Sequence, residues 1–150
     1  MTLDKIKTIL EKNRYYSEHK IEHGLVPYPC LKVLLEDQEA EDYYLQLGFI
    51  PGIDDQLDHH KLMQFFVPIV SVDGDTAPDI SQFLHEINKE LALPAFVIDL
   101  NAELIYYRYT LPIPHDISAN FENQFIEIVE LIFFQIVQFA NAIKLASVQQ

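Results

Sequence analysis

Clustered aspartate and histidine residues are the part of this sequence best suited to metal chemistry. The stretch "DDQLDHH", Asp54–His60, holds three Asp and two His within seven residues. Carboxylate and imidazole ligands this close together can bind a divalent cation, so a metal-binding or small-molecule enzyme that uses this loop is one hypothesis. The spacing does not match an EF-hand loop, because the glycine at the sixth position and the terminal glutamate are missing. We therefore expect a polar connector here, with no metal site.

A second cluster, "EHKIEH", places His19 and His23 four residues apart. On a helix these two side chains would share a face, as zinc ligands do. The order of residues differs from the HExxH motif, in which the glutamate follows the first histidine directly. The segment also lacks a clear helical pattern, so we expect a solvated charged turn.

Motifs for nucleophilic catalysis and phosphate binding are missing from the sequence. It has no GxSxG, and its four glycines form no phosphate-cradling loop. The single cysteine, Cys30, excludes an internal disulfide and precedes an apolar run, so we expect a buried thiol. His85 falls on the polar face of a predicted helix, and His115 lies in a proline-containing loop. We expect no catalytic residues, no cofactor and no enzyme activity.

The chain is strongly acidic, with a net charge of −13 and only ten Lys and Arg residues among 150. Nucleic-acid binding requires clustered cations, and anionic membranes repel an acidic surface, so we expect neither partner. The first segment, "MTLDKIKTIL", is charged and amphipathic, unlike a signal peptide. No apolar run approaches the roughly 20 residues that cross a bilayer, so we expect a cytoplasmic protein.

The elements that must position the candidate residues follow from hydrophobic periodicity. Apolar residues recur at helical spacing in three segments, whereas β-branched and aromatic runs between them favour strands. The pattern predicts one domain, 1–150, of class α+β, with helices packed on a five-stranded antiparallel sheet in the order α-β-β-β-α-β-β-α. The predicted helices cover about 3–13, 78–91 and 121–147, and the predicted strands about 30–37, 42–50, 62–72, 95–99 and 104–111.

The predicted hairpin at 95–111 carries large side chains on both faces. A register that pairs Asp99 with Leu104, through a loop of two or four residues, avoids placing Asp99 opposite Glu103. Asn101 is then expected to take any left-handed position, since the turn has no glycine. The core face of this register holds Phe96, Ile98, Ile105, Tyr107, Tyr109 and Leu111. The mixed face holds Ala95, Val97, Asp99, Leu104, Tyr106, Arg108 and Thr110.

Arg108 stands on the mixed face and is the only Lys or Arg between Glu90 and Ile143. We expect it to pair with a carboxylate, on Asp99 or on a neighbouring strand, or to stack on a tyrosine. Tyrosine and arginine are residues that protein interfaces favour. Leu104, Tyr106 and Arg108 are therefore predicted to bind a partner.

The terminal helix is too apolar to have only one narrow face covered. Its apolar residues occupy more than half of the circumference, and its polar residues form a narrow stripe of Asn123, Glu127, Glu130, Gln138 and Asn141. Phe134 lies almost on this polar line and is predicted to bind a partner as well. Two arrangements fit the pattern: the helix packs on the mixed face of its own hairpin, or it contacts a second chain.

Three segments carry a resemblance to a known family. "FLHEINKELALPAFVID" is similar to a helix with an Asn near its end, here Asn88, followed by a strand. "FVIDLNAELIYYRYTLPIP" is similar to a hairpin of this family, whose pattern corresponds here to Asp99, Glu103, Leu104, Tyr107, Arg108 and Leu111. "FENQFIEIVELIFFQIVQFANAI" is similar to the terminal helix of the family. With the element order, these segments resemble the type III secretion chaperone-like fold, including the YbjN family, although the turn glycine common in YbjN-like hairpins is missing. The resemblance implies a non-enzymatic homodimer that binds a polypeptide, or a protein of unknown role that shares the fold.

The sequence thus favours a cytoplasmic protein-interaction, chaperone-like or regulatory protein. It would act as a homodimer with a protein or peptide client. Two other hypotheses stay open: an enzyme that uses the Asp54–His60 loop, and a structural subunit of a larger complex.

Overall fold

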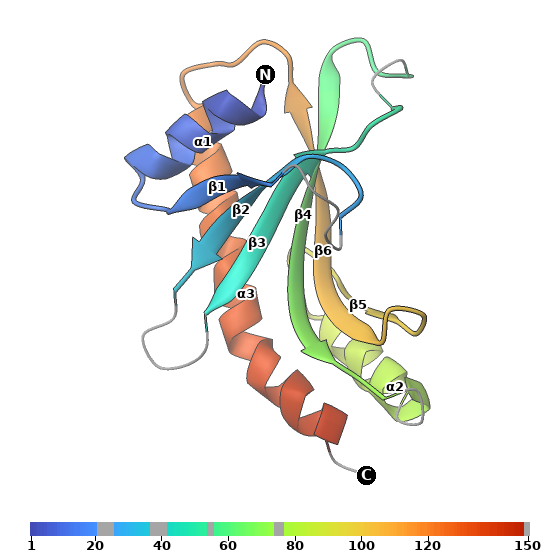
Figure 1. The fold of residues 1–150 in the computed structure, drawn as a ribbon. Helices are drawn as coiled ribbons and strands as arrows, with labels where there is room; N and C mark the ends of the chain where they lie inside the picture. Colours follow the sequence, from blue (N-terminus) through green and yellow to red (C-terminus); the bar gives the residue numbers. More distant parts are fainter. Residues whose placement is uncertain (21–25, 37–41, 54–55, 74–76, 149–150) are drawn as a thin grey trace.

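The computed structural model describes residues 1–20, 26–36, 42–53, 56–73 and 77–148. Three helices and a six-stranded antiparallel sheet make up this part of the chain (Figure 1). The helices are α1 (Leu3–Lys12), α2 (Ala77–Asn88) and α3 (Phe121–Val148). The strands are β1 (Ser17–Lys20), β2 (Cys30–Leu35), β3 (Tyr43–Phe49), β4 (His60–Ser71), β5 (Phe96–Asp99) and β6 (Leu104–Pro114). Their order across the sheet is β1-β2-β3-β4-β6-β5.

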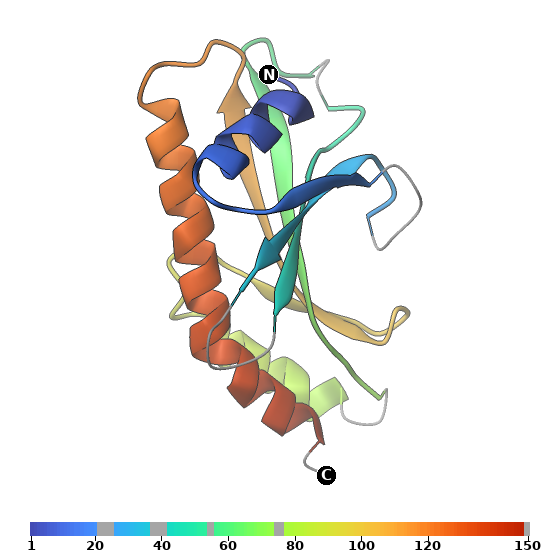
Figure 2. The same cartoon turned by 60° about the vertical axis from the view of Figure 1, so that its left-hand side comes forward.

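The helices lie on one side of the sheet, and the long helix α3 runs down that side (Figures 1 and 2). The core lies between these two layers. Buried side chains of the strands, such as Phe65 and Tyr107, share it with Leu10 of α1, Ile80 of α2 and Ile132 of α3. The opposite face of the sheet carries no helix in the described part of the chain, and we call it the open face.

The predicted α+β class, helices and five strands are confirmed, but the sheet has a sixth strand. Ser17–Lys20 forms β1 and pairs with β2 at the edge of the sheet, so residues 18–20 of the predicted charged turn, 18–23, lie on a strand. This segment has no apolar residue, so its pattern gives no strand signal. Pairing with β2 defines the strand instead, because tertiary context overrides β-propensity.

The hairpin register is confirmed, since Asp99 pairs with Leu104 and Ile98 with Ile105. The left-handed residue of the turn is Glu103, with φ of 51°, and the prediction of Asn101 was wrong. Oδ1 of Asp99 accepts hydrogen bonds from the Asn101 and Ala102 N–H groups, at 3.0 and 3.2 Å. These bonds fix the backbone at the start of the loop, so the positive φ occurs at the last loop residue, Glu103.

The free edge of β5 is closed by Asn88, at the end of α2. Its side chain donates a hydrogen bond to the Phe96 carbonyl and accepts one from the Phe96 N–H, both at 2.8 Å. An edge strand with unpaired N–H and C=O groups can pair with another chain. The Asn88 amide blocks such pairing at Phe96 and joins α2 to the sheet.

Candidate functional site

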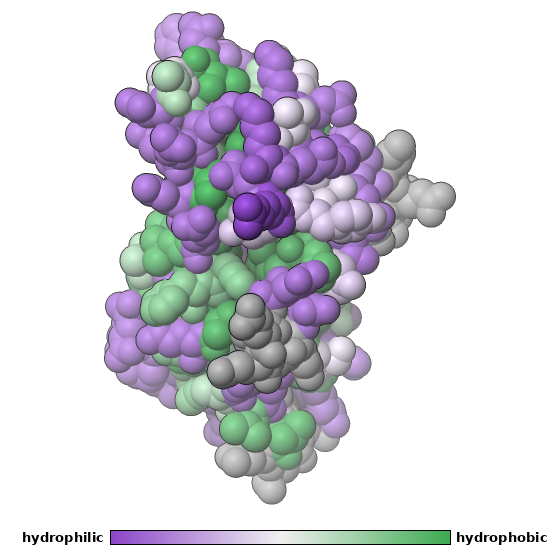
Figure 3. Space-filling view, turned by 90° about the vertical axis from the view of Figure 1, so that its left-hand side faces the viewer, coloured by the Kyte–Doolittle hydropathy of each residue, from purple (hydrophilic) through white to green (hydrophobic). Residues whose placement is uncertain are grey.

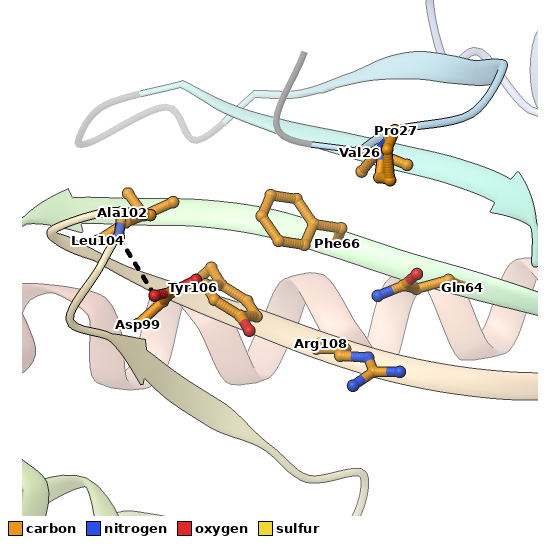
Figure 4. Close-up of a pocket in the computed structure, with 9 residues that line it drawn as sticks. All are labelled: Val26, Pro27, Gln64, Phe66, Asp99, Ala102, Leu104, Tyr106 and Arg108. Atoms are coloured by element: carbon orange, nitrogen blue, oxygen red, sulfur yellow. Dashed lines mark hydrogen bonds between the residues drawn. The ribbon is translucent and has the colours of Figure 1, made fainter. Parts of the chain in front are cut away.

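The open face is hollowed where β4 and β6 pass beneath the segment that leads into β2 (Figure 4). This open-face cavity has a volume of about 170 Å³. Its lining consists of Val26, Pro27, Gln64, Phe66, Asp99, Ala102, Leu104, Tyr106 and Arg108. Three of the four residues predicted to bind a partner, Leu104, Tyr106 and Arg108, therefore line one cavity. They meet there because residues two apart on a strand point to the same face of the sheet.

Two aromatic rings form the middle of the cavity wall (Figure 4). Phe66 of β4 and Tyr106 of β6 have ring centroids 4.7 Å apart and ring planes inclined by 31°. Phe66 is only 6% exposed although no helix covers this face. The Tyr106 ring packs against it, and Val26 and Pro27 line the same cavity from the segment that leads into β2 (Figure 4).

The covering segment is held by Tyr28. Its hydroxyl donates a hydrogen bond to Oε1 of Gln64. Its ring lies against Gly48 of β3, where a Cβ would come within 2.7 Å of the ring, so glycine makes room for the segment. Burial raises the pKa of Tyr28, while the Arg108 guanidinium acts in the opposite direction. The hydroxyl therefore remains protonated at neutral pH and keeps its role as a donor to Gln64.

Arg108 is exposed at one end of the cavity. No carboxylate of a described residue lies within 4.0 Å of its guanidinium, and no described aromatic ring stacks with it. The predicted pairing with Asp99 or stacking on tyrosine was therefore wrong for the described residues. Asp99 lies at the other end of the cavity, where its carboxylate accepts the two N–H groups of the turn.

Phe134 lies on a different surface, on the outer side of α3. It is 63% exposed, and four other large apolar residues of the helix are exposed with it: Leu131, Val137, Leu145 and Val148. We call these five residues the α3 apolar surface. Figure 3 shows apolar side chains gathered around the middle of the side that α3 covers. Beside Phe134 is a groove of about 180 Å³, lined by Glu90, Leu91, Ala92, Leu131, Phe134, Gln135, Gln138 and Phe139.

Helix α3, which carries the apolar surface, lies on one side of the sheet (Figure 2), and the cavity lies on the open face. The buried residues of α3 share the core with Ile105 and Tyr107, which face away from the open-face cavity. The arrangement in which α3 packs on the mixed face of its own hairpin was therefore wrong. The structure brings Leu104, Tyr106 and Arg108 together and leaves Phe134 apart.

Sequence reasoning missed the contributions of Val26, Pro27, Gln64 and Phe66 to the cavity. A signal for Phe66 exists, because "LMQFFVPIV" carries apolar residues at both parities, which indicates that both faces of β4 are covered. The covering segment gives no comparable signal, since a pattern of prolines predicts only an extended or looped chain.

The predicted absence of a metal site is not tested over the whole loop, because Asp54 and Asp55 lie outside the described residues, as does His23. Among the described residues, no group of three or more His, Cys, Asp or Glu side chains could hold a metal ion. His19 lies on β1, and its Nε2 is 2.9 Å from Oδ1 of Asp4. The thiol of Cys30 is buried, as predicted.

Helix α3 is long and apolar enough to cross a membrane, judged by length and composition alone. The sequence expectation that no segment has this property was therefore wrong, because it considered only unbroken apolar runs. Ten residues of α3 are buried in the structure, including Phe125, Val129 and Ile136. The core helix of a globular domain passes the same test, so this property is weak support for a membrane span.

Comparison with protein-family models gives no match for this chain, and comparison with curated protein sequences gives none either. The resemblance to the type III secretion chaperone-like fold therefore stays a prediction.

Proposed function

We propose that this chain is a non-enzymatic, cytoplasmic protein-interaction protein that forms a homodimer and binds a polypeptide. One observation carries the proposal: the α3 apolar surface and the mixed open-face cavity, two separate candidate interfaces, lie on opposite sides of the sheet. One surface can then join two copies while the other remains accessible to a client. The resemblance of three segments, which form its last four elements, to the type III secretion chaperone-like family is in keeping with this function.

The α3 apolar surface is the proposed dimer interface. Exposed Phe134 projects beside a groove whose volume, about 180 Å³, suits one aromatic side chain. In a two-fold dimer the same patch is used by both subunits, so Phe134 of each copy would enter the groove of the other. Burying one side chain of this size contributes about 1.5–3 kcal/mol, and the symmetry doubles each contact.

The open face is the proposed client surface. It offers the tilted ring pair of Phe66 and Tyr106, the half-buried Leu104 side chain and the Arg108 guanidinium within one cavity. Aromatic and arginine side chains are the commonest anchors of protein interfaces. A polypeptide can lay an apolar side chain against these rings without moving any helix of the core.

Light scattering coupled to size exclusion tests the dimer. At high micromolar concentration we expect a dimer mass for the wild type and a monomer mass for Phe134→Glu, since two buried carboxylates would face the opposite grooves. Asn123→Glu, an exposed change on the same helix outside the α3 apolar surface, should stay dimeric. A wild-type monomer at this concentration contradicts the proposed assembly.

Binding of a fluorescent library of random 12-residue peptides tests the client surface. We expect the wild type and Phe134→Glu to retain peptides and Tyr106→Glu to lose them, because the introduced charge lies in the cavity. If Tyr106→Glu retains the same peptides as the wild type, the open face is not the client surface.

A further inference from the structure

We propose that the open-face cavity binds the C-terminal residue of a polypeptide. The free carboxylate of that residue accepts hydrogen bonds from Arg108, and its apolar side chain packs against Phe66 and Tyr106. This inference rests on the proposed function and states the chemistry of the client that the same surface recognises.

The Arg108 end of the cavity carries two side-chain donor groups, the guanidinium and the Gln64 amide. The guanidinium carries several N–H groups, and no carboxylate of a described residue lies within 4.0 Å of it. Gln64 reaches the same end from β4, as Figure 4 shows. The Tyr28 hydroxyl donates to Oε1 of Gln64, which leaves the Nε2 group of this amide as a further donor. Such a pair of donors matches a carboxylate, which only accepts hydrogen bonds.

The absence of a carboxylate partner around Arg108 is unusual for so acidic a chain. The sequence has 23 Asp and Glu residues and a net charge of −13. Arg108 sits in a cross-strand row with neutral neighbours: it pairs with Phe66 on β4, and Phe66 pairs with Gln46 on β3. The cross-strand neighbours of Arg108 on β4 and β3 are therefore uncharged, and the acid of the cavity lining, Asp99, lies at the opposite end.

The middle of the cavity accepts one apolar side chain. Its volume of about 170 Å³ is close to the roughly 150 Å³ of an engineered protein cavity that binds benzene. The walls at this point are the Phe66 and Tyr106 rings, with Val26 and Pro27 across from them. A ring or a branched aliphatic group therefore fits, and a second large side chain does not.

The other end of the cavity limits the ligand to one carboxylate. Asp99 lies there, held by the turn N–H groups that its Oδ1 accepts. Its negative charge repels a second acid at that end. The ligand is thus an apolar group with a single carboxylate close to it.

A polypeptide has this combination at its C-terminus, where one Cα joins the carboxylate to the last side chain. A small apolar carboxylic acid has the same chemistry, so the experiment must separate the two sources. Backbone atoms upstream of the last residue add contacts along the open face, and we therefore assign the site to a chain end.

Calorimetry with matched probes tests this assignment. The probes are the acetylated peptide Gly-Ser-Gly-Ser-Phe as a free acid, the same peptide as a C-terminal amide, and 3-phenylpropanoate. On the wild type we expect the free acid to bind at least about tenfold more tightly than the amide, as for a hydrogen-bonded charge pair. On Arg108→Gln this preference should disappear, because both peptides then meet a neutral side chain.

Lys32→Gln is the matched control, since it removes the same charge from the open face. Lys32 lies on β2 and pairs with Gln46, so it belongs to the same cross-strand row as Arg108. Its ammonium group lies over the Tyr44 ring, 4.1 Å from the ring centroid. This variant should keep the preference for the free acid. Loss of the preference in Lys32→Gln would show a general charge effect and overturn the assignment to Arg108.

Three other results would also overturn the inference. Equal binding of acid and amide would leave polypeptide binding intact but exclude carboxylate recognition. Binding of 3-phenylpropanoate as tight as that of the peptide acid would assign the cavity to small acids. If neither short peptide binds while the random library is still retained, the client surface stands and the C-terminal assignment falls.

Discussion

Gln135 and Leu93, 42 residues apart in the sequence, are joined by two hydrogen bonds. The Gln135 side chain accepts from the Leu93 N–H and donates to the Leu93 carbonyl, each at 3.0 Å. The Tyr107 hydroxyl donates to the same carbonyl at 2.7 Å. This buried amide on α3 satisfies the backbone of the loop before β5 and so ties the helical layer to the hairpin that forms the open-face cavity.

Replacing Gln135 by Met should lower the free energy of unfolding by about 1–3 kcal/mol, because the Leu93 N–H loses its partner inside the protein. The Leu93 carbonyl keeps the Tyr107 hydroxyl, which limits the loss. Urea denaturation at pH 7 measures the change. Gln82→Met, an exposed site on α2, should change stability by less than about 0.5 kcal/mol. Equal effects of the two substitutions would show that the Leu93 contacts contribute nothing.

Stability should fall with rising pH above about 10, the usual pKa of tyrosine. Burial raises the pKa of Tyr107, and burial likewise raises that of Tyr15. Above pH 10 the unfolded chain has released protons that the folded chain still holds, so the free energy of unfolding decreases with pH. Below pH 10 these tyrosines contribute no pH dependence, since both states are protonated.

Urea midpoints between pH 7 and 11 test this prediction for Tyr107. The Tyr107→Phe variant loses the hydrogen bond to Leu93 and should be less stable at pH 7, but its midpoint should decline less steeply above pH 10. Parallel curves for the variant and the wild type would contradict the assignment of this pH dependence to Tyr107.

Gly48→Ala should displace the segment that covers the open-face cavity. The added Cβ would lie 2.7 Å from the Tyr28 ring and 3.0 Å from the Pro29 carbonyl oxygen. Overpacking of this kind costs about 1–3 kcal/mol of folding free energy. In the Tyr28→Ala background the ring is absent, so Gly48→Ala should cost less there. A double-mutant cycle measures this coupling, and strict additivity would show that the two residues do not contact each other.

Glu103→Gly should stabilise the hairpin by about 0.5 kcal/mol, because glycine adopts a positive φ without the strain of a Cβ. Glu103 has φ of 51°, whereas Asn101 is not among the positive-φ residues of the described chain. Asn101→Gly should therefore destabilise by a similar amount, through the greater backbone freedom of the unfolded state. Thermal unfolding of both variants separates the two positions, and stabilisation by Asn101→Gly alone would contradict the structure.

The sequence by itself determined the helices, the core faces of β2, β3 and the hairpin, and the hairpin register. These features depend on local periodicity: apolar residues repeat at helical spacing in α1 and at every second position in β2, and burial follows that repeat. The pairing of Asp99 with Leu104 was predictable because the other register would have opposed two acids. The grouping of Leu104, Tyr106 and Arg108 followed from the same alternation.

Only the tertiary structure decided the rest of the candidate site. β1 exists because β2 offers a partner edge, and the open-face cavity exists because Tyr28 rests on Gly48 and on Gln64. The partner of Gln135 likewise lies in a distant loop. Such contacts join residues far apart along the chain, and no local pattern of residue types records them. The separation of Phe134 from the cavity has the same cause, since the path of α3 across the sheet places it on the opposite side.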